Sequence, residues 1–367
     1  LNANIALDSE ARLSEAPLFL VSGQLPSIDI DLWHKVLQRY WDFGAQLAAD
    51  KPAAPSAPVD NTLIAGLPFR ARVQLGEYDV GPLHLTDIAV EAEPLADAWK
   101  IQFINPTATG KVYLPNDTTR PLQINLQSLK LTSALLGVEP EAGTTPEHVK
   151  PRGPSVDPRS LPNGSISVDA LYMDGSNYGN WSLQMHPTAQ GAVFENIHGS
   201  VRGVTINGAD SEIEGARMEW NLGDAGANTH FTGSLAATDL SEVLKQWQKP
   251  DTIESKNARF RADVSWAGDP QDFALKKLRG DMNIWVEKGR FKRNPGAGSD
   301  GFLRLMAILN FDSLARRLRL DFSDLYQSGL AYDQISGKVS FEPGTMTFSE
   351  PLMVISPSSR LQMMGKL

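Results

Sequence analysis

The side chains that could do chemistry in this chain are carboxylates and histidines, because the 367 residues include no cysteine. Asp29 with Asp31 and Asp321 with Asp324 are acidic pairs that lie near each other in the sequence. Both pairs flank segments with helical periodicity, where acidic side chains are expected as caps. A glycosidase needs two carboxylates facing one cleft, and nothing in the sequence singles out such a pair.

Histidine spacing does not favour a metal site. No two of the histidines are arranged as His-x-x-x-His, which is the usual zinc spacing on a helix. His186 and His198 could meet across neighbouring strands, and we interpret them as exposed strand residues. The chain also has no Gly-x-Ser-x-Gly motif of serine hydrolases. We therefore predict no metal and no catalytic residues, and we expect that the protein is not an enzyme.

One glycine-rich segment, residues 296–301, fits the dinucleotide-binding fingerprint as a string of letters. That fingerprint works only inside a parallel βαβ unit, where a helix N-terminus receives the pyrophosphate. The segment upstream belongs to an antiparallel series, and no second parallel strand follows closely. We interpret residues 296–301 as a loop and predict no cofactor.

Composition and charge narrow the class of partner. The hydrophobic fraction of 41% and the charged fraction of 21% are typical of a folded protein, and 30 Gly with 24 Pro suit many turns. The net charge of −9 argues against nucleic acid as a partner. No apolar run reaches the ~20 residues that span a bilayer. The chain begins without Met and ends on strand-like sequence, so we expect it to be a segment of a longer protein.

The dominant pattern along the chain is alternation of apolar and polar residues. Phe260 and Val264 alternate with Arg259, Arg261 and Asp263, for example. Successive side chains of a strand point to opposite faces, so each such stretch has one apolar and one polar face. This is typical of antiparallel sheets, whereas buried parallel strands are continuously apolar. The predicted apolar-face residues are Phe69, Ala71, Val73, Trp99, Ile101, Phe103, Leu122, Ile124, Trp181, Leu183, Met185, Met218, Trp220, Phe260, Ala262, Val264, Trp266, Met282, Ile284, Val286, Val339, Phe341, Met346 and Phe348. Trp285 is an apolar exception on the polar face.

The number of strands limits the possible architectures. We count roughly 18–20 candidate strands, and open sheets rarely exceed about ten without curling, splitting or closing. The sheet must therefore curl around its apolar face, form a sandwich, or close into a barrel. Helical segments and Pro-rich connections argue against a transmembrane barrel. The sandwich is the structural alternative to an open groove.

Three segments have helical periodicity, near residues 31–42, 239–248 and 301–320. We expect them to pack on the sheet or at its ends; binding to a membrane surface or a partner is the alternative. Residues 139–162 are rich in Pro and predict a surface loop or linker. The predicted organisation is thus a first β-groove segment at 1–138, the linker, and a second β-groove segment at 163–367.

Several dissimilar motifs of the later half resemble one family. They are FLRLMAILNFDSLARRL at 302–318, LDFSDL at 320–325, GLAYDQISG at 329–337, DLSEVLKQW at 239–247 and ADVSWAGDPQDF at 262–273. In order and spacing they are similar to the C-terminal AsmA-like region of the YhdP branch of bacterial envelope proteins. The earlier half resembles this family only around residues 25–33 and in its strand pattern.

This resemblance implies a mostly β fold in which a long curled antiparallel sheet forms an open groove with an apolar interior. It also implies a Gram-negative periplasmic protein, anchored in the inner membrane by an N-terminal helix that this chain lacks. The implied ligands are phospholipids or other acyl-chain lipids, conducted towards the outer membrane without a chemical step. Two alternatives stay open: an envelope scaffold or assembly factor that binds proteins, and an envelope enzyme acting on glycan.

Overall fold

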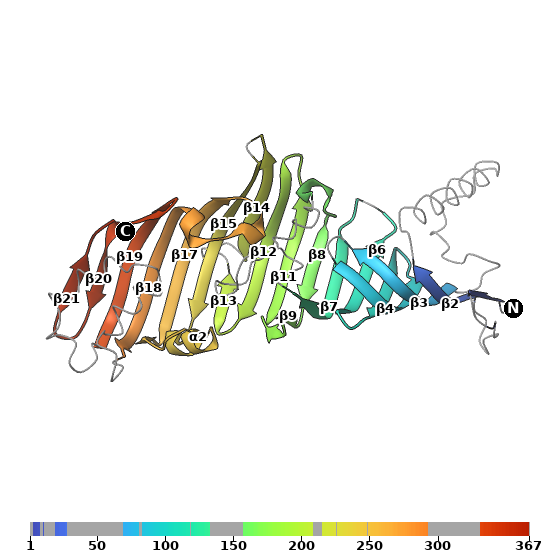
Figure 1. Cartoon of the computed structure of the whole chain (residues 1–367), viewed down its shortest axis with the longest axis horizontal. Coiled ribbons are helices and arrows are strands. Elements are labelled where there is room, and N and C mark those ends of the chain that lie inside the picture. The colour runs from blue at the N-terminus through green and yellow to red at the C-terminus, as the bar shows by residue number, and fades with distance from the viewer. Residues whose placement is uncertain are drawn as a thin grey trace, which may run out of the picture. The chain divides into compact units, whose positions relative to one another are not determined.

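The computed structural model describes residues 3–7, 10, 19–27, 69–80, 83–117, 119–132, 157–207, 215–224, 226–247, 249–292 and 331–366. Most of them lie in strands (Figure 1). The chain divides into two compact units, residues 1–156 with 162–175 and residues 157–161 with 176–367. The predicted mostly β fold of the curled β-groove type is confirmed.

The first unit is a sheet whose strands follow chain order. Its strands are β1 (Ala3–Leu7), β2 (Phe19–Ser27), β3 (Phe69–Val80), β4 (Leu83–Pro94), β5 (Ala98–Ile104), β6 (Ala108–Pro115), β7 (Leu122–Leu131), β8 (Gly164–Val168) and β9 (Leu171–Met173). The strands from β3 to β7 pair as an antiparallel meander. The buried centre is small and consists of Leu75, Leu85 and Ile88.

The second unit continues the alternation of strands and short turns. It comprises the 3₁₀ turn η1 (Pro158–Ser160), then β10 (Ser176–Asn177), β11 (Asn180–Pro187), β12 (Gly191–Val201), β13 (Val204–Asn207), β14 (Ala216–Gly223), β15 (Gly226–Ala237), α2 (Leu240–Gln246), β16 (Ile253–Glu254), β17 (Asn257–Ala267), η2 (Pro270–Asp272), η3 (Leu275–Lys277), β18 (Arg279–Phe291), β19 (Ala331–Glu342), β20 (Thr345–Ile355) and β21 (Arg360–Met363). All of the strand pairs with a described register in this unit are antiparallel.

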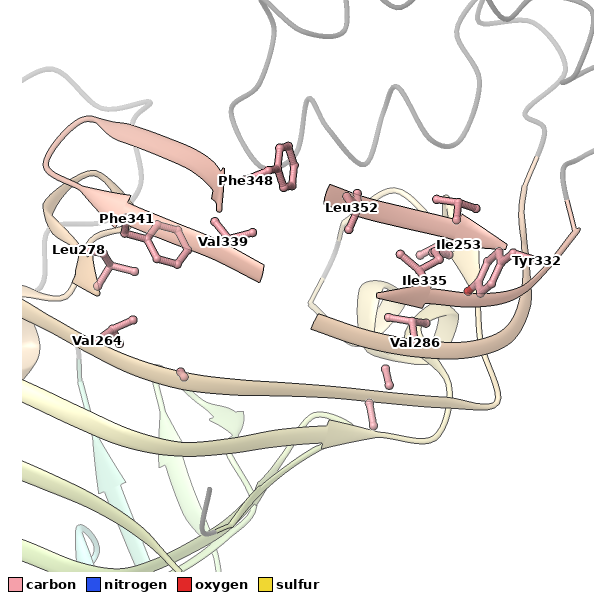
Figure 2. Packing of buried hydrophobic residues seen from close by; sticks show 14 of the residues in the cluster. Ile253, Val264, Leu278, Val286, Tyr332, Ile335, Val339, Phe341, Phe348 and Leu352 are labelled. Atoms are coloured by element: carbon pink, nitrogen blue, oxygen red, sulfur yellow. The ribbon is translucent and has the colours of Figure 1, made fainter. Parts of the chain in front are cut away.

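The largest hydrophobic core lies on one face of β15 to β21. Val264, Leu278, Val339 and Phe341 gather towards one end of these strands, and Val286 lies with a second group towards the other (Figure 2). The second group also contains Ile253, Tyr332, Ile335 and Leu352. The core is built by neighbouring strands that present side chains to the same side, as the alternation predicts.

The purely antiparallel prediction is wrong for four strand pairs of the first unit. The β1–β2, β2–β3 and β7–β8 pairs are parallel, and β9 also pairs parallel to β7. Alternation of residue types does not distinguish the two directions when one face of the sheet is polar. Parallel neighbours need a long connection rather than a hairpin. The sheet is therefore mixed.

Of the three predicted helices, the one near 239–248 is confirmed as α2. Asp239 caps its N-terminus, and its carboxylate accepts a hydrogen bond from the Ser241 backbone N–H at 2.9 Å. The predicted helices near 31–42 and 301–320 lie outside the described residues. Most of the predicted linker at 139–162 also lies outside them, and its last part forms η1, which contacts β11, β12 and β14.

Candidate functional site

The candidate site of the first unit is a set of apolar rows that cross the strands. A row here means residues that face one another directly on successive strands, and such residues share one face of the sheet. One row contains Val73, Val90, Phe103, Gly110, Leu126 and Val168. The next row contains Ala71, Ala92, Ile101, Val112, Ile124 and Ile166. Alternation along each strand thus becomes an apolar surface that runs across the strands.

The second unit carries longer rows of the same kind. The first row contains Trp181, Gly199, Ile206, Leu235, Phe260, Ile284 and Gly337. The second contains Met185, Phe194, Met218, Phe231, Val264, Gly280, Phe341 and Met346. With strands about 4.8 Å apart, six spacings make the first row about 29 Å long.

Three shorter rows complete this face of the second unit. They contain Ala262, Met282, Val339 and Phe348; Ala258, Val286, Ile335, Val354 and Leu361; and Ala192, Trp220, Thr229 and Trp266. All five rows together hold apolar side chains, glycines and one threonine, and no charged residue. Phe260, Met282 and Ile284 are half-buried, so part of this surface remains open to contact.

The structure places the remaining predicted residues as follows. Trp99 faces Pro94 and Leu114, and Leu122 faces Gly164. Leu183 is half-buried in β11 at a register shift between Ser182 and Gln184. The backbone of Phe69 pairs with that of Phe19. That these residues contact a lipid stays a prediction.

Glycines in the rows, and Gly233 opposite the row member Ala262, make room for neighbouring side chains. A Cβ atom on Gly199 would lie 2.7 Å from Cε3 of the Trp181 ring, so the indole rests on the bare backbone of β12. A Cβ atom on Gly233 would lie 2.5 Å from the Cβ atom of Ala216. These positions keep the rows close together without breaking their apolar character.

The opposite face of the same strands is charged. Arg70 and Lys100 both contact Glu93, at 3.0 and 2.7 Å, and these hydrogen bonds, that of Lys100 first, lower the pKa of the carboxyl. In the second unit, hydrogen bonds from Ser340 and then Lys338 lower the pKa of Asp281. The two faces of each sheet therefore differ sharply: cross-strand ion pairs on one, apolar rows on the other.

The charged face of the second unit carries a shallow cavity of about 420 Å³. Trp285, the apolar exception on this face, lines part of it. Its side chain is 44% exposed, and its indole N–H donates to Glu287 at 2.9 Å. Asn257 and Arg259 complete the lining.

Within the part of the chain that the structure describes, no group of acidic and histidine side chains is arranged to hold a metal ion. None of the helices described there has the length and apolar character to cross a membrane.

Two tryptophans of the third short row are fixed by one loop. The indole N–H of Trp220 donates to the Asp269 carboxylate at 3.1 Å, and that of Trp266 donates to the Asp269 carbonyl oxygen at 3.0 Å. Phe273 packs edge-on against Trp266, with ring centroids 5.4 Å apart. The loop of residues 268–273 thus covers this end of the row and ties β14 to β17.

Sequence reasoning missed several members of the rows. Phe194, Phe231, Leu235 and Ile335 lie on the same face as the predicted residues. The period-two signal that found the others is present around Phe231 and Leu235, where they alternate with His230, Thr232 and Ser234. The role of Asp269 had no such signal, because one of its two partners, Trp220, lies on β14, far from it in sequence.

Comparison with known proteins gives a consistent result. A family model described as YhdP protein matches residues 1–367. A curated protein of Escherichia coli (strain K12), named intermembrane phospholipid transporter YhdP, is 18% identical over 290 residues, which cover 79% of this chain. The chain spans 22% of the length of that relative. No solved structure matches the chain significantly.

Proposed function

Because the chain belongs to the YhdP family, we propose that it is a segment of a conduit that carries phospholipid between membranes along its apolar rows. The name of the E. coli relative, intermembrane phospholipid transporter YhdP, supports phospholipid as the cargo. The observation that carries the proposal is the uninterrupted apolar face: five rows of the second unit without a charged side chain.

The chemistry of such a face suits acyl chains. Removing each CH₂ group from water is worth about 0.8 kcal/mol, so a row of apolar side chains can hold a lipid tail firmly. Neighbouring positions along a row are chemically alike, so a tail has no deep trap and can slide from strand to strand. Movement along such a face requires no bond to form or break, and we propose no catalytic step.

The proposal also includes the cellular location of the segment and the attachment of its parent protein. We propose that the segment acts in the periplasm, that the parent protein is anchored in the inner membrane, and that envelope proteins contribute to its attachment. The charged opposite face suits contact with water, since its carboxylates are already paired with Arg and Lys across the strands.

Native mass spectrometry of protein purified without delipidation tests the proposal. We expect phospholipid masses on the protein that disappear after extraction with organic solvent and return when phospholipid is added back. Protein that carries no phospholipid in either state would contradict the proposal. If the lipid-free protein instead retained a protein partner, the envelope scaffold would be the better account.

A further inference from the structure

A cation–aromatic cluster lies at the end of the β12–β13 strand pair. The Arg202 guanidinium carbon lies 4.6 Å from the ring centroid of Tyr178 and 5.3 Å from that of Trp247. The two rings meet edge to face, with centroids 6.4 Å apart. We call Tyr178, Arg202 and Trp247 the rim cluster, because Arg202 lies in the turn that follows β12 and Trp247 is the C-cap of α2.

The backbone holds this cluster in place. Arg202 and Gly203 both have positive φ, 45° and 82°, and form the tight turn between β12 and β13. Trp247 is the C-cap of α2. The helix itself is fixed by a buried hydroxyl: Ser241 donates to Asp251 at 2.8 Å, and Lys292 contacts both residues.

The guanidinium of Arg202 is held by the two rings, and it donates no hydrogen bond within the part of the chain that the structure describes. Because the two rings stand at 84° to each other, the planar guanidinium can stack flat on at most one of them, and the N–H groups that do not point at a ring remain available as donors. Among the described residues, Arg202 makes no ion pair, whereas Arg70, Arg217 and Arg290 each contact a carboxylate. The Gln246 amide lies nearby, 3.8 Å from where a Cβ atom on Gly203 would stand. Such donors match an anion with several oxygen atoms.

The rim cluster connects directly to the first row of the second unit. The backbone carbonyl of Tyr178 accepts a hydrogen bond from the indole N–H of Trp181 at 2.8 Å. Trp181 begins the row that leads through Gly199 to Phe260 and Ile284. Val201, which precedes Arg202, is buried. The strand end therefore carries hydrogen-bond donors that suit an anion. The apolar surface of the first row begins next to them and leads towards the interior of the face.

We propose that the rim cluster binds the phosphate of a phospholipid headgroup while the acyl chains of the same lipid lie on the first row. Tyr178 and Trp247 orient the guanidinium, Arg202 supplies the charged donors, and Gln246 adds a neutral donor. This inference rests on the proposed function. It adds that the rim cluster is the place where the apolar face distinguishes a phospholipid, by its phosphate, from an uncharged lipid.

The test compares two lipids with the same chains, dioctanoylphosphatidylglycerol and dioctanoylglycerol, titrated against the full chain by native mass spectrometry. The unaltered protein is expected to bind the phospholipid at least about tenfold more tightly, because charged hydrogen bonds contribute more than neutral ones. Arg202→Gln removes the charge and keeps a planar side chain. It is expected to abolish the difference between the lipids and to leave dioctanoylglycerol binding unchanged.

The control variant is Arg259→Gln, on the opposite, exposed face, and it is expected to preserve the tenfold preference. If Arg202→Gln weakens the binding of both lipids equally, the headgroup site is overturned and the role of Arg202 is purely structural. Unchanged phospholipid binding would also overturn it. Inorganic phosphate is expected not to displace the phospholipid; if phosphate alone competes through Arg202, the ligand is a free anion and not a lipid. Failure of the unaltered protein to bind either lipid would contradict the proposed function itself.

Discussion

Replacing Ile284 with aspartate is expected to weaken phospholipid binding on the order of a hundredfold. Ile284 is half-buried in β18, between Phe260 and Gly337 of the first row. An aspartate at mid-membrane depth costs about 2.5–3.5 kcal/mol on insertion scales, and an acyl chain presents a similar environment. The row would then carry a charge at its middle, where a lipid tail must pass. Titration with phospholipid by native mass spectrometry measures the effect.

The adjacent residue provides a matched control. Asn283 precedes Ile284 on the same strand but belongs to the exposed face, where it lies between Arg261 and Lys338. Asn283→Asp adds the same charge one position away and is expected to leave lipid binding within about twofold of the original value, since its neighbours are cations. Ile284→Leu, which keeps the side chain apolar, should also bind normally. Equal losses in Ile284→Asp and Asn283→Asp would mean that the apolar row is not the binding surface.

Replacing Trp266 with alanine is expected to cause the largest loss of stability. Trp266 is 5% exposed, donates to the Asp269 carbonyl oxygen and packs against Phe273. Removing a buried tryptophan typically costs 3–5 kcal/mol because it leaves a cavity as well as losing burial. Since the chain has two units, the loss is best followed locally by hydrogen–deuterium exchange. Amides of β15 and β17 are expected to exchange roughly a hundredfold faster, which corresponds to about 3 kcal/mol.

Trp285 serves as the comparison for this variant. It lies on β18 with 44% of its side chain exposed and a single indole hydrogen bond, to Glu287. Trp285→Ala is expected to cost less than about 1 kcal/mol, in line with surface substitutions. If the two variants change the amide exchange rates of β15 and β17 equally, the loop of residues 268–273 does not tie β14 to β17 through Trp220 and Trp266.

The sequence predicted the faces of residues better than the pairing of strands. A period of two fixes the face of Phe260 and Ile284 once each lies in a strand, and antiparallel hairpins then align them. Local exceptions were not predictable: Lys288 has a positive φ of 49°, and the carbonyl oxygens of Glu287 and Lys288 both accept a hydrogen bond from the Lys256 N–H. Such irregularities depend on contacts between strands.

The length of a connection limits the direction in which two strands can pair, which alternation alone does not. A two-residue turn suffices for antiparallel neighbours, whereas parallel neighbours need a connection of a dozen residues or more. The chain between β2 and β3 and the Pro-rich chain between β7 and β8 are both long, and these are places where the sheet is parallel. A long connection permits parallel pairing but does not require it, since β18 and β19, which are joined by residues 292–330, pair antiparallel.

The rim cluster shows the limit of sequence reasoning. Tyr178, Arg202 and Trp247 are separated by strands and a helix, and each alone is an ordinary surface residue type. Only the alignment of β12 with α2 brings the two rings to the guanidinium. Its chemistry depends on tertiary packing that no local pattern encodes.

The central claim is that lipid lies on one face of the second unit, and site-specific photo-crosslinking tests it most directly. A photoreactive amino acid is introduced at one position at a time, and adducts with labelled phospholipid are counted after illumination in cells that make the protein. The apolar-face positions are Phe260, Met282 and Ile284, and the opposite-face positions are Arg259, Arg261 and Asn283. We expect adducts at the first three positions and none at the other three, so that labelling alternates along each strand. Equal labelling of both faces, or labelling of neither, would contradict the account.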